Sequence, residues 1–87
     1  MTTDSRENDR VYWHSRRGML EIDVKLMPFA KEVYPTLNDK DKATYQRLLE
    51  EEDTQLFAWV LQREVPEDTA LCQMMKRILR FARESHT

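Results

Sequence analysis

Residues 69–83 read TALCQMMKRILRFAR, and this stretch has the most regular apolar pattern in the chain. Its apolar side chains recur at i, i+3, i+4, i+7, i+8 and i+11, namely at Leu71, Met74, Met75, Ile78, Leu79 and Ala82. This spacing places them on one face of an α-helix. The opposite face would carry the basic residues Lys76, Arg77, Arg80 and Arg83. The pattern predicts an amphipathic helix whose apolar face other helices must cover.

Four further helices are predicted upstream of this stretch. The first runs from about residue 4 or 5 to Arg17, and the second, apolar on most of its circumference, from about residue 19 to 34. The second helix should therefore be the central and most buried one. Pro28 should kink it or begin a new turn, and Tyr34-Pro35 should end it. Asn38 is expected to cap the third helix, which has carboxylates in its first turn and is closed by residues 50–52. The fourth starts at Asp53 and ends before Val65-Pro66.

The third and fourth helices should each bury one apolar face. The third is expected to bury Tyr45, Leu48 and Leu49, and the fourth Leu56, Phe57, Val60 and Leu61, with Trp59 at its flank. No stretch alternates with period two for long enough to predict a strand. The sequence therefore predicts an all-α fold, a compact bundle of about five short helices in a single helical domain, 1–87. Its ends should fray at about 1–5 and 84–87.

Composition excludes several classes of protein. The 87 residues carry a net charge of −2, distributed as an acidic middle (−5 over residues 35–68) and a basic end (+3 over residues 69–87). An acidic middle disfavours nucleic acid as a partner. The lone Cys72 excludes an internal disulfide. The two histidines, His14 and His86, are too distant in sequence to suggest a metal site. The early acidic residues and the lack of a long apolar run predict a cytoplasmic protein without a membrane span. The helical segments and the lack of clustered ligands or catalytic motifs predict a monomer without a metal or a catalytic group.

The only glycine, Gly18, lies within Arg16-Arg17-Gly18-Met19-Leu20-Glu21, where about six glycines would be usual for the whole chain. It could simply end the first helix, with both arginines in the last turn and Glu21 in the first turn of the next helix. The same corner would also display Arg16, Arg17 and Glu21 to a partner. Met19 could be displayed beside them. Nearby Trp13 could either fill the core or anchor an interface.

Arg17-Gly18-x-x-Glu21 resembles the RGxxE signature of the small succinate dehydrogenase assembly factors, also called SdhE-like flavinylation factors. The resemblance extends over about residues 10–81, through Trp13, Glu21-x-Asp23, Met27-Pro28-Phe29, Leu48-Leu49-Glu50, Asp53 and Leu56-Phe57-x-Trp59. The RGxxE pattern alone is weak. Together with the downstream residues at matching spacing, it is a strong indication of the family.

The resemblance implies an assembly factor rather than an enzyme. Such factors bind the flavoprotein subunit of succinate dehydrogenase, and in bacteria often that of fumarate reductase, and promote covalent attachment of FAD to it. The factor would hold no cofactor of its own and would act on FAD held by the partner. The resemblance places the partner-binding surface at Arg10, Arg16, Arg17, Gly18, Met19 and Glu21. Glu21 would either orient Arg17 or pair with a cation of the partner.

Two alternatives remain open from the residues. The basic C-terminal helix could belong to a regulator that binds nucleic acid or neutralises a toxin. The bundle could also be a generic helical adaptor with no link to flavin.

Overall fold

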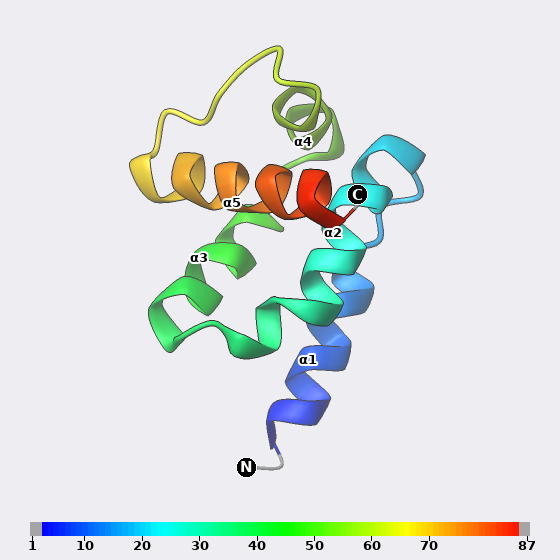
Figure 1. Ribbon diagram of the computed structural model, residues 1–87, viewed down its shortest axis with the longest axis vertical. Helices are drawn as coiled ribbons and strands as arrows, with labels where there is room; N and C mark the ends of the chain where they lie inside the picture. The colour runs from blue at the N-terminus through cyan, green and yellow to red at the C-terminus, as the bar shows by residue number, and fades with distance from the viewer. Residues whose placement is uncertain (1–2, 86–87) are drawn as a thin grey trace.

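Five α-helices and one 3-10 turn make up most of residues 3–85, the part of the chain that the computed structural model describes (Figure 1). In chain order they are α1 (Thr3–His14), α2 (Leu20–Glu32), η1 (Tyr34–Thr36), α3 (Asp39–Leu48), α4 (Asp53–Val60) and α5 (Thr69–Ser85). The described residues contain no strand. The predicted all-α bundle of about five helices is confirmed.

Helix α5 lies across the middle of the molecule and organises the core. In Figure 1, α4 lies above α5, α3 lies below it, and α1 runs beside α2. The most extensive contacts join α5 to α2 and to α3. The core combines apolar residues from all five α-helices with Tyr34 of η1. Covering the apolar face of α5 is thus what brings α2, α3 and α4 together.

The predicted stripe of α5 is confirmed except at one position. Leu71, Met74, Met75, Ile78 and Ala82 are buried, whereas Leu79 is only partly buried against the core. Ile78 and Ala82 lie at the middle of the buried face, and Leu79 lies at one edge of it. Phe81 lies at the other edge and packs its ring against Phe29. The ring centroids of that pair are 5.9 Å apart.

Helix α3 begins as predicted and ends earlier. The side chain of Asn38 accepts a hydrogen bond of 2.8 Å from the backbone N–H of Asp41, which confirms the cap. Tyr45, Leu48 and Leu49 are buried, also as predicted. However, α3 ends at Leu48, so residues 50 and 51 lie in the following turn and residue 52 occupies the N-cap of α4.

The inner face of α4 is rotated relative to the prediction. Trp59 is buried together with Leu56 and Val60, whereas Phe57 is partly buried and Leu61 is exposed. Leu61 lies beyond the last helical residue, at the C-cap, and therefore does not follow the helical periodicity of the face. Leu56, Trp59 and Val60 have the i, i+3, i+4 spacing of one helix face.

Helix α2 has a central place but is not buried all round. It packs against α1, α4 and α5 and contains Pro28, as predicted. On its outer side Leu20 and Val24 are exposed. The helix ends at Glu32, and Tyr34-Pro35 continues the chain as η1 rather than simply stopping it.

Both ends of the described chain are helical. Residues 3–5 and 84–85, which were expected to fray, lie within α1 and α5, and the other end residues, including His86, lie outside the described part. Among the described helices, none combines the length and apolar character that crossing a membrane requires.

Candidate partner-binding corner

The segment between α1 and α2, here called the corner and comprising residues 15–21, is not a simple helix end. Helix α1 stops at His14, so Arg16 and Arg17 lie beyond its last turn, contrary to the prediction. Gly18 has a φ of +80°, a left-handed conformation that favours glycine. It is therefore a turn residue four positions past α1. A Cβ built on Gly18 would have no atom within 4 Å, so the space in front of it is open.

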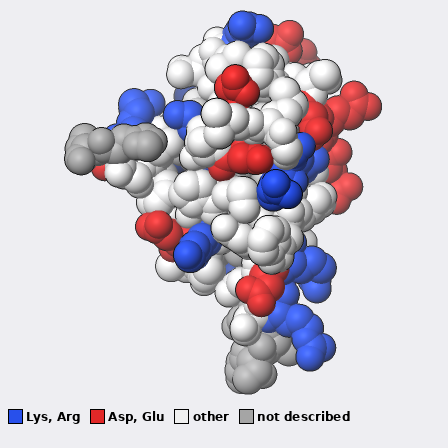
Figure 2. Space-filling view, turned by 90° about the vertical axis from the view of Figure 1, so that its right-hand side faces the viewer, with Lys and Arg blue, Asp and Glu red and all other residues white. Residues whose placement is uncertain are grey.

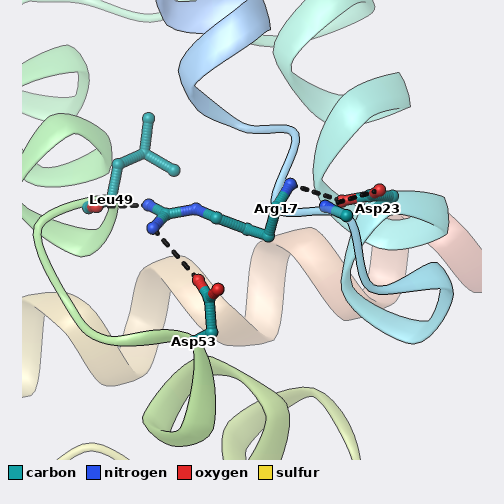
Figure 3. A network of polar contacts seen from close by, with 5 residues as sticks. Arg17, Asp23, Leu49 and Asp53 are labelled. Atoms are coloured by element: carbon teal, nitrogen blue, oxygen red, sulfur yellow. Dashed lines mark hydrogen bonds and ion pairs between the residues drawn. The ribbon is translucent and has the colours of Figure 1, made fainter.

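The side chain of Arg17 points into the molecule rather than towards solvent. Figure 3 shows it extending from the corner to the turn between α3 and α4. There its Nη2 donates to the carbonyl oxygen of Leu49, and its Nη1 lies 3.3 Å from Oδ1 of Asp53. Only 13% of the Arg17 side chain is exposed. The expectation that the corner displays this guanidinium is therefore wrong, because the α3–α4 turn and Asp53 take its hydrogen bonds.

Asp23, in the first turn of α2, holds the backbone of the corner from the other side (Figure 3). The N–H of Arg17 donates to Oδ1 of Asp23 at 2.7 Å, and the N–H of Gly18 donates to Oδ2 at 3.2 Å. One carboxylate thus satisfies two consecutive backbone donors. These bonds fix the chain on both sides of the left-handed residue.

A buried hydrogen-bond network seats the start of the corner on α3. Ser15 has no exposed surface, and its hydroxyl donates to the carbonyl oxygen of Val11 at 2.8 Å. Because the proton of this hydroxyl goes to Val11, the hydroxyl of Tyr45 is the donor in their 2.7 Å contact, and the carbonyl oxygen of Leu26 lies 3.4 Å from the Tyr45 oxygen. Burial raises the pKa of Tyr45 well above its usual range. Ser15 and Tyr45 therefore join α1, α2 and α3 through neutral groups.

Sequence reasoning missed the roles of Ser15, Asp23 and Asp53. A carboxylate in the first turn after a glycine loop is a weak signal for Asp23, since such residues often bond nearby backbone N–H groups. Asp53 lies 36 residues from Arg17, and no local pattern predicts that pairing.

The remaining charged residues of the predicted site lie on the surface of the protein. Arg10, Arg16 and Glu21 are exposed. Within the described residues Glu21 forms no hydrogen bond or ion pair, and the guanidinium of Arg17 is bound by Asp53 and Leu49 instead. Glu21 therefore does not orient Arg17. Met19, at the N-cap of α2, is partly buried against the core and contributes little displayed surface.

Exposed apolar side chains lie within the corner and on both sides of it. Trp13 is 63% exposed and Leu20 is 72% exposed, and Val24 lies one turn after Leu20 on the same face of α2. Trp13 stacks edge-on against Tyr12, with ring centroids 5.2 Å apart. Of the two readings of Trp13, the structure excludes the core.

A groove of about 310 Å³ opens beside Trp13, between α1 and the end of α2. Its walls include Asn8, Tyr12, Trp13, Ala30 and Lys31. Figure 2 faces the side of the molecule on which the corner lies and shows uncharged surface between separate acidic and basic groups. Apolar area bordered by charges is typical of a protein-binding surface.

The basic face of α5 forms a second candidate surface. Lys76, Arg77, Arg80 and Arg83 are all exposed and line a groove of about 320 Å³ with Gln62. Asp41 already neutralises Arg77, with 3.0 Å between Nη1 and Oδ2.

Within the described residues, side chains that could bind a metal ion do not gather at either surface. No group of three or more His, Cys, Asp or Glu side chains within residues 3–85 could hold a metal ion. Cys72, the only thiol, is half-buried on α5.

Comparison with known proteins agrees with the resemblance noted in the sequence. Residues 9–82 match the family Sdh5, described as flavinator of succinate dehydrogenase. The chain is similar to the FAD assembly factor SdhE of Pseudomonas aeruginosa, with 54% identity over 76 residues, or 87% of this chain and 90% of the relative. It is 56% identical over 73 residues to the FAD assembly factor SdhE of Pseudomonas savastanoi pv. phaseolicola, covering 84% and 87% of the two chains. The protein of the same name from Shewanella oneidensis is 49% identical over 69 residues, covering 79% and 84%.

Proposed function

Because the chain belongs to the family of flavinators of succinate dehydrogenase, we propose that it binds the flavoprotein subunit of that enzyme. Binding would promote covalent attachment of FAD to the subunit. The relatives named FAD assembly factor support this role. We extend the proposal to the flavoprotein of fumarate reductase as a second partner.

The observation that carries the proposal is the composition of the corner. Arg16 and Glu21 stand exposed on either side of Gly18, and the space above Gly18 is open for the backbone of a partner. Trp13 and Leu20 add apolar area beside these charges. Aromatic residues and arginine are the commonest energetic anchors of protein interfaces. The corner therefore combines anchors, charges and room for close approach on one rigid turn.

Arg10 would extend this surface along α1. It is exposed and lies one turn before Trp13, so both side chains project from the same side of the helix. Met19 would contribute by closing the base of the corner. Arg17 is the remaining residue of the predicted partner-binding surface, but its side chain points into the protein.

The chain's part in the reaction would be to position, not to react. FAD is held by the partner, and the covalent bond is formed within the flavoprotein itself. A factor that binds one arrangement of the partner's domains more tightly than others raises the population of that arrangement. Correct alignment of reacting groups can contribute several kcal/mol to a rate without a new catalytic group.

Co-expression with the flavoprotein subunit tests the proposal. Covalent flavin is measured as fluorescence that survives a denaturing gel. The chain should increase this signal, and Glu21→Ala should strongly reduce it while the helices remain folded. A first-turn carboxylate contributes only about 0.3–1 kcal/mol to its helix.

Glu32→Ala is the matched control, because Glu32 is also an exposed carboxylate and lies at the other end of α2. With the Glu32→Ala variant, the flavoprotein subunit should gain as much covalent flavin as with the parent protein. No gain of covalent flavin with the parent chain would refute the proposed function. Binding of a DNA duplex that weakens steeply with salt would favour the basic face of α5 and a regulatory role instead.

A further inference from the structure

Three side chains, those of Arg17, Asp23 and Asp53, hold the corner in shape. Arg17 and Asp23 bind to each other through the backbone of the corner, and Arg17 binds Asp53 through its guanidinium. We propose that Arg17, Asp23 and Asp53 are positioning residues, which hold Arg16, Gly18 and Glu21 in the arrangement that the flavoprotein recognises. This inference rests on the proposed function and assigns the signature arginine an internal role.

The contacts of Arg17 leave little of it for a partner. Nη1 and Nη2 are bound by Asp53 and Leu49, and Nε is buried without a hydrogen-bond partner. Turning the side chain outward would strip the carbonyl oxygen of Leu49 and the carboxylate of Asp53 of their donor. Buried or half-buried acceptors without donors are costly. The guanidinium therefore stays inside when the corner meets a partner.

Asp23 links the two exposed charges of the corner. It shares the first turn of α2 with Glu21, so its position relative to Glu21 is fixed by helical geometry. Its two oxygens hold the N–H groups of Arg17 and Gly18, which directly follow Arg16. Asp23 thus fixes where Arg16 stands relative to Glu21.

Asp53 supplies the second fixed point, outside α1 and α2. It lies in the first turn of α4, where the helix dipole favours a carboxylate. Its ion pair with Arg17 joins the corner to an element 36 residues away. With both points in place, the left-handed turn at Gly18 is held between α2 and α4.

Conservative variants separate positioning from simple stability. Asp23→Asn and Asp53→Asn keep size and remove charge, and Arg17→Lys keeps charge but loses the planar fork. Asp68→Asn is the matched control. Asp68 and Asp53 each have side chains 44% exposed and each pair with an arginine, but Asp68 pairs with Arg47, at 2.8 Å. Arg47→Lys is the corresponding control for Arg17→Lys.

The first measurement titrates each variant against a fixed amount of flavoprotein with FAD. Positioning predicts that Asp23→Asn and Asp53→Asn raise the half-maximal concentration of the factor about tenfold, with the final yield of covalent flavin unchanged. Asp53→Glu, which restores the carboxylate, should recover part of the loss. The two controls should match the parent protein.

The second measurement is a double-mutant cycle with Glu21→Ala. If Asp23 acts through the exposed corner, Asp23→Asn should weaken docking much less in the Glu21→Ala background than in the parent. Equal, additive effects in both backgrounds would indicate a general loss of folded protein and overturn the proposal.

The third measurement needs no partner. Amide hydrogen exchange at Arg17 and Gly18 should accelerate in Asp23→Asn, while the amide of the core residue Ile78 stays protected.

If the parent protein promotes covalent flavin attachment but the variants match it at every concentration, positioning is refuted and the proposed function stands. If the parent protein does not flavinylate, the function fails, and unchanged exchange at Gly18 would refute the internal clamp as well.

One further outcome would reassign Arg17. If Arg17→Lys alone lost docking while Asp53→Asn docked normally and exchange at Gly18 were unchanged, Arg17 would contact the partner directly. If Asp53→Asn failed to fold, the same titration would use Asp53→Glu, whose longer side chain shifts the carboxylate without removing its charge.

Discussion

At Gly18 the backbone φ is +80°, and no atom lies within 4 Å of the place where a Cβ would stand. Packing therefore does not demand a glycine there. The left-handed conformation does, because it brings the Cβ of an ordinary residue too close to its own backbone. The strain and the free space can be tested separately, since they affect different measurements.

Gly18→Ala should lower the free energy of unfolding by about 1 kcal/mol. Gly18→Asn should lower it by less, because asparagine tolerates the left-handed region. Urea denaturation measures both. Flavinylation should decrease in both variants, since each places a side chain in the open space that a partner would approach. Equal stability of Gly18→Ala and the parent protein would mean that the corner relaxes in solution.

Trp13 and Leu20 show what the sequence can and cannot reveal about single residues. Both are apolar and lie in helical patterns, and such residues usually belong to a core. Periodicity alone cannot distinguish a buried residue from an apolar residue kept at the surface for a partner. The pairing of Arg17 with Asp53 was also beyond sequence reasoning, because the fold and not a local motif joins them.

Single elements were more predictable when several residues indicated the same face. In α5, six periodic positions agreed, and five of them are buried. In α4, the short helix offers only a few positions, and the C-cap residue Leu61 was mistaken for part of the inner face. A long amphipathic helix therefore fixes its own orientation, whereas a short one takes its orientation from its neighbours.

Two adjacent residues of α5 test this orientation. Ile78 is fully buried and Leu79 is partly buried, so Ile78→Ala should cost about 3 kcal/mol and Leu79→Ala about 1 kcal/mol. Urea denaturation of the two variants measures the difference. A larger cost at Leu79 than at Ile78 would show that α5 is rotated about its axis relative to this structure.

The contact between α1, η1 and α3 should depend on pH. The hydroxyl of Tyr34 donates to Oε2 of Glu7 at 2.7 Å and accepts from Nε2 of Gln46 at 2.6 Å. Burial, aided by the hydrogen bond to Glu7, raises the pKa of Tyr34 to about 12 from its ordinary value of 10.0. Because the folded state holds the phenol proton more tightly, this stabilisation is complete below about pH 10 and is lost as the pH rises towards 12.

Comparison with Tyr34→Phe isolates this effect. The free energy of unfolding of the parent protein should fall more steeply above about pH 10 than that of Tyr34→Phe. Urea midpoints measured at a series of alkaline pH values provide the test. Parallel profiles for the two proteins would show that Tyr34 titrates normally in the folded state.

On the scale of the whole molecule, the fold class, the helix order and most of the core were predictable from the sequence. The interior of the candidate site was not. Its exposed members were predicted from the motif, Glu21 as part of it and Arg16 as its neighbour, while the contacts of Asp23 and Asp53 became visible only in the fold. Motifs indicate which residues work together, but a structure is needed to show which of them face a partner.

The whole molecule is also expected to act as a monomer that carries no flavin of its own. Among the described residues, only a few large apolar side chains are exposed, namely Trp13, Leu20, Val24, Leu61 and Val65. Light scattering should therefore give the mass of one chain, and the purified protein should lack the visible absorbance of flavin. A stable dimer that Leu20→Glu dissociates would show instead that the corner face binds a second copy.

Helix α5 follows α1 to α4 in chain order, and this order has a consequence during synthesis. The helix that covers α2 and α3 leaves the ribosome after both of them, so the nascent bundle exposes its apolar faces until α5 has been made. The Arg17–Asp53 tie, between elements that α5 holds together, gains its support only then. A polypeptide truncated before Thr69 would lack this cover and would be a substrate for proteases rather than a competitor for the flavoprotein. Under the proposed function, the order of the helices therefore restricts docking to chains in which α5 has been made.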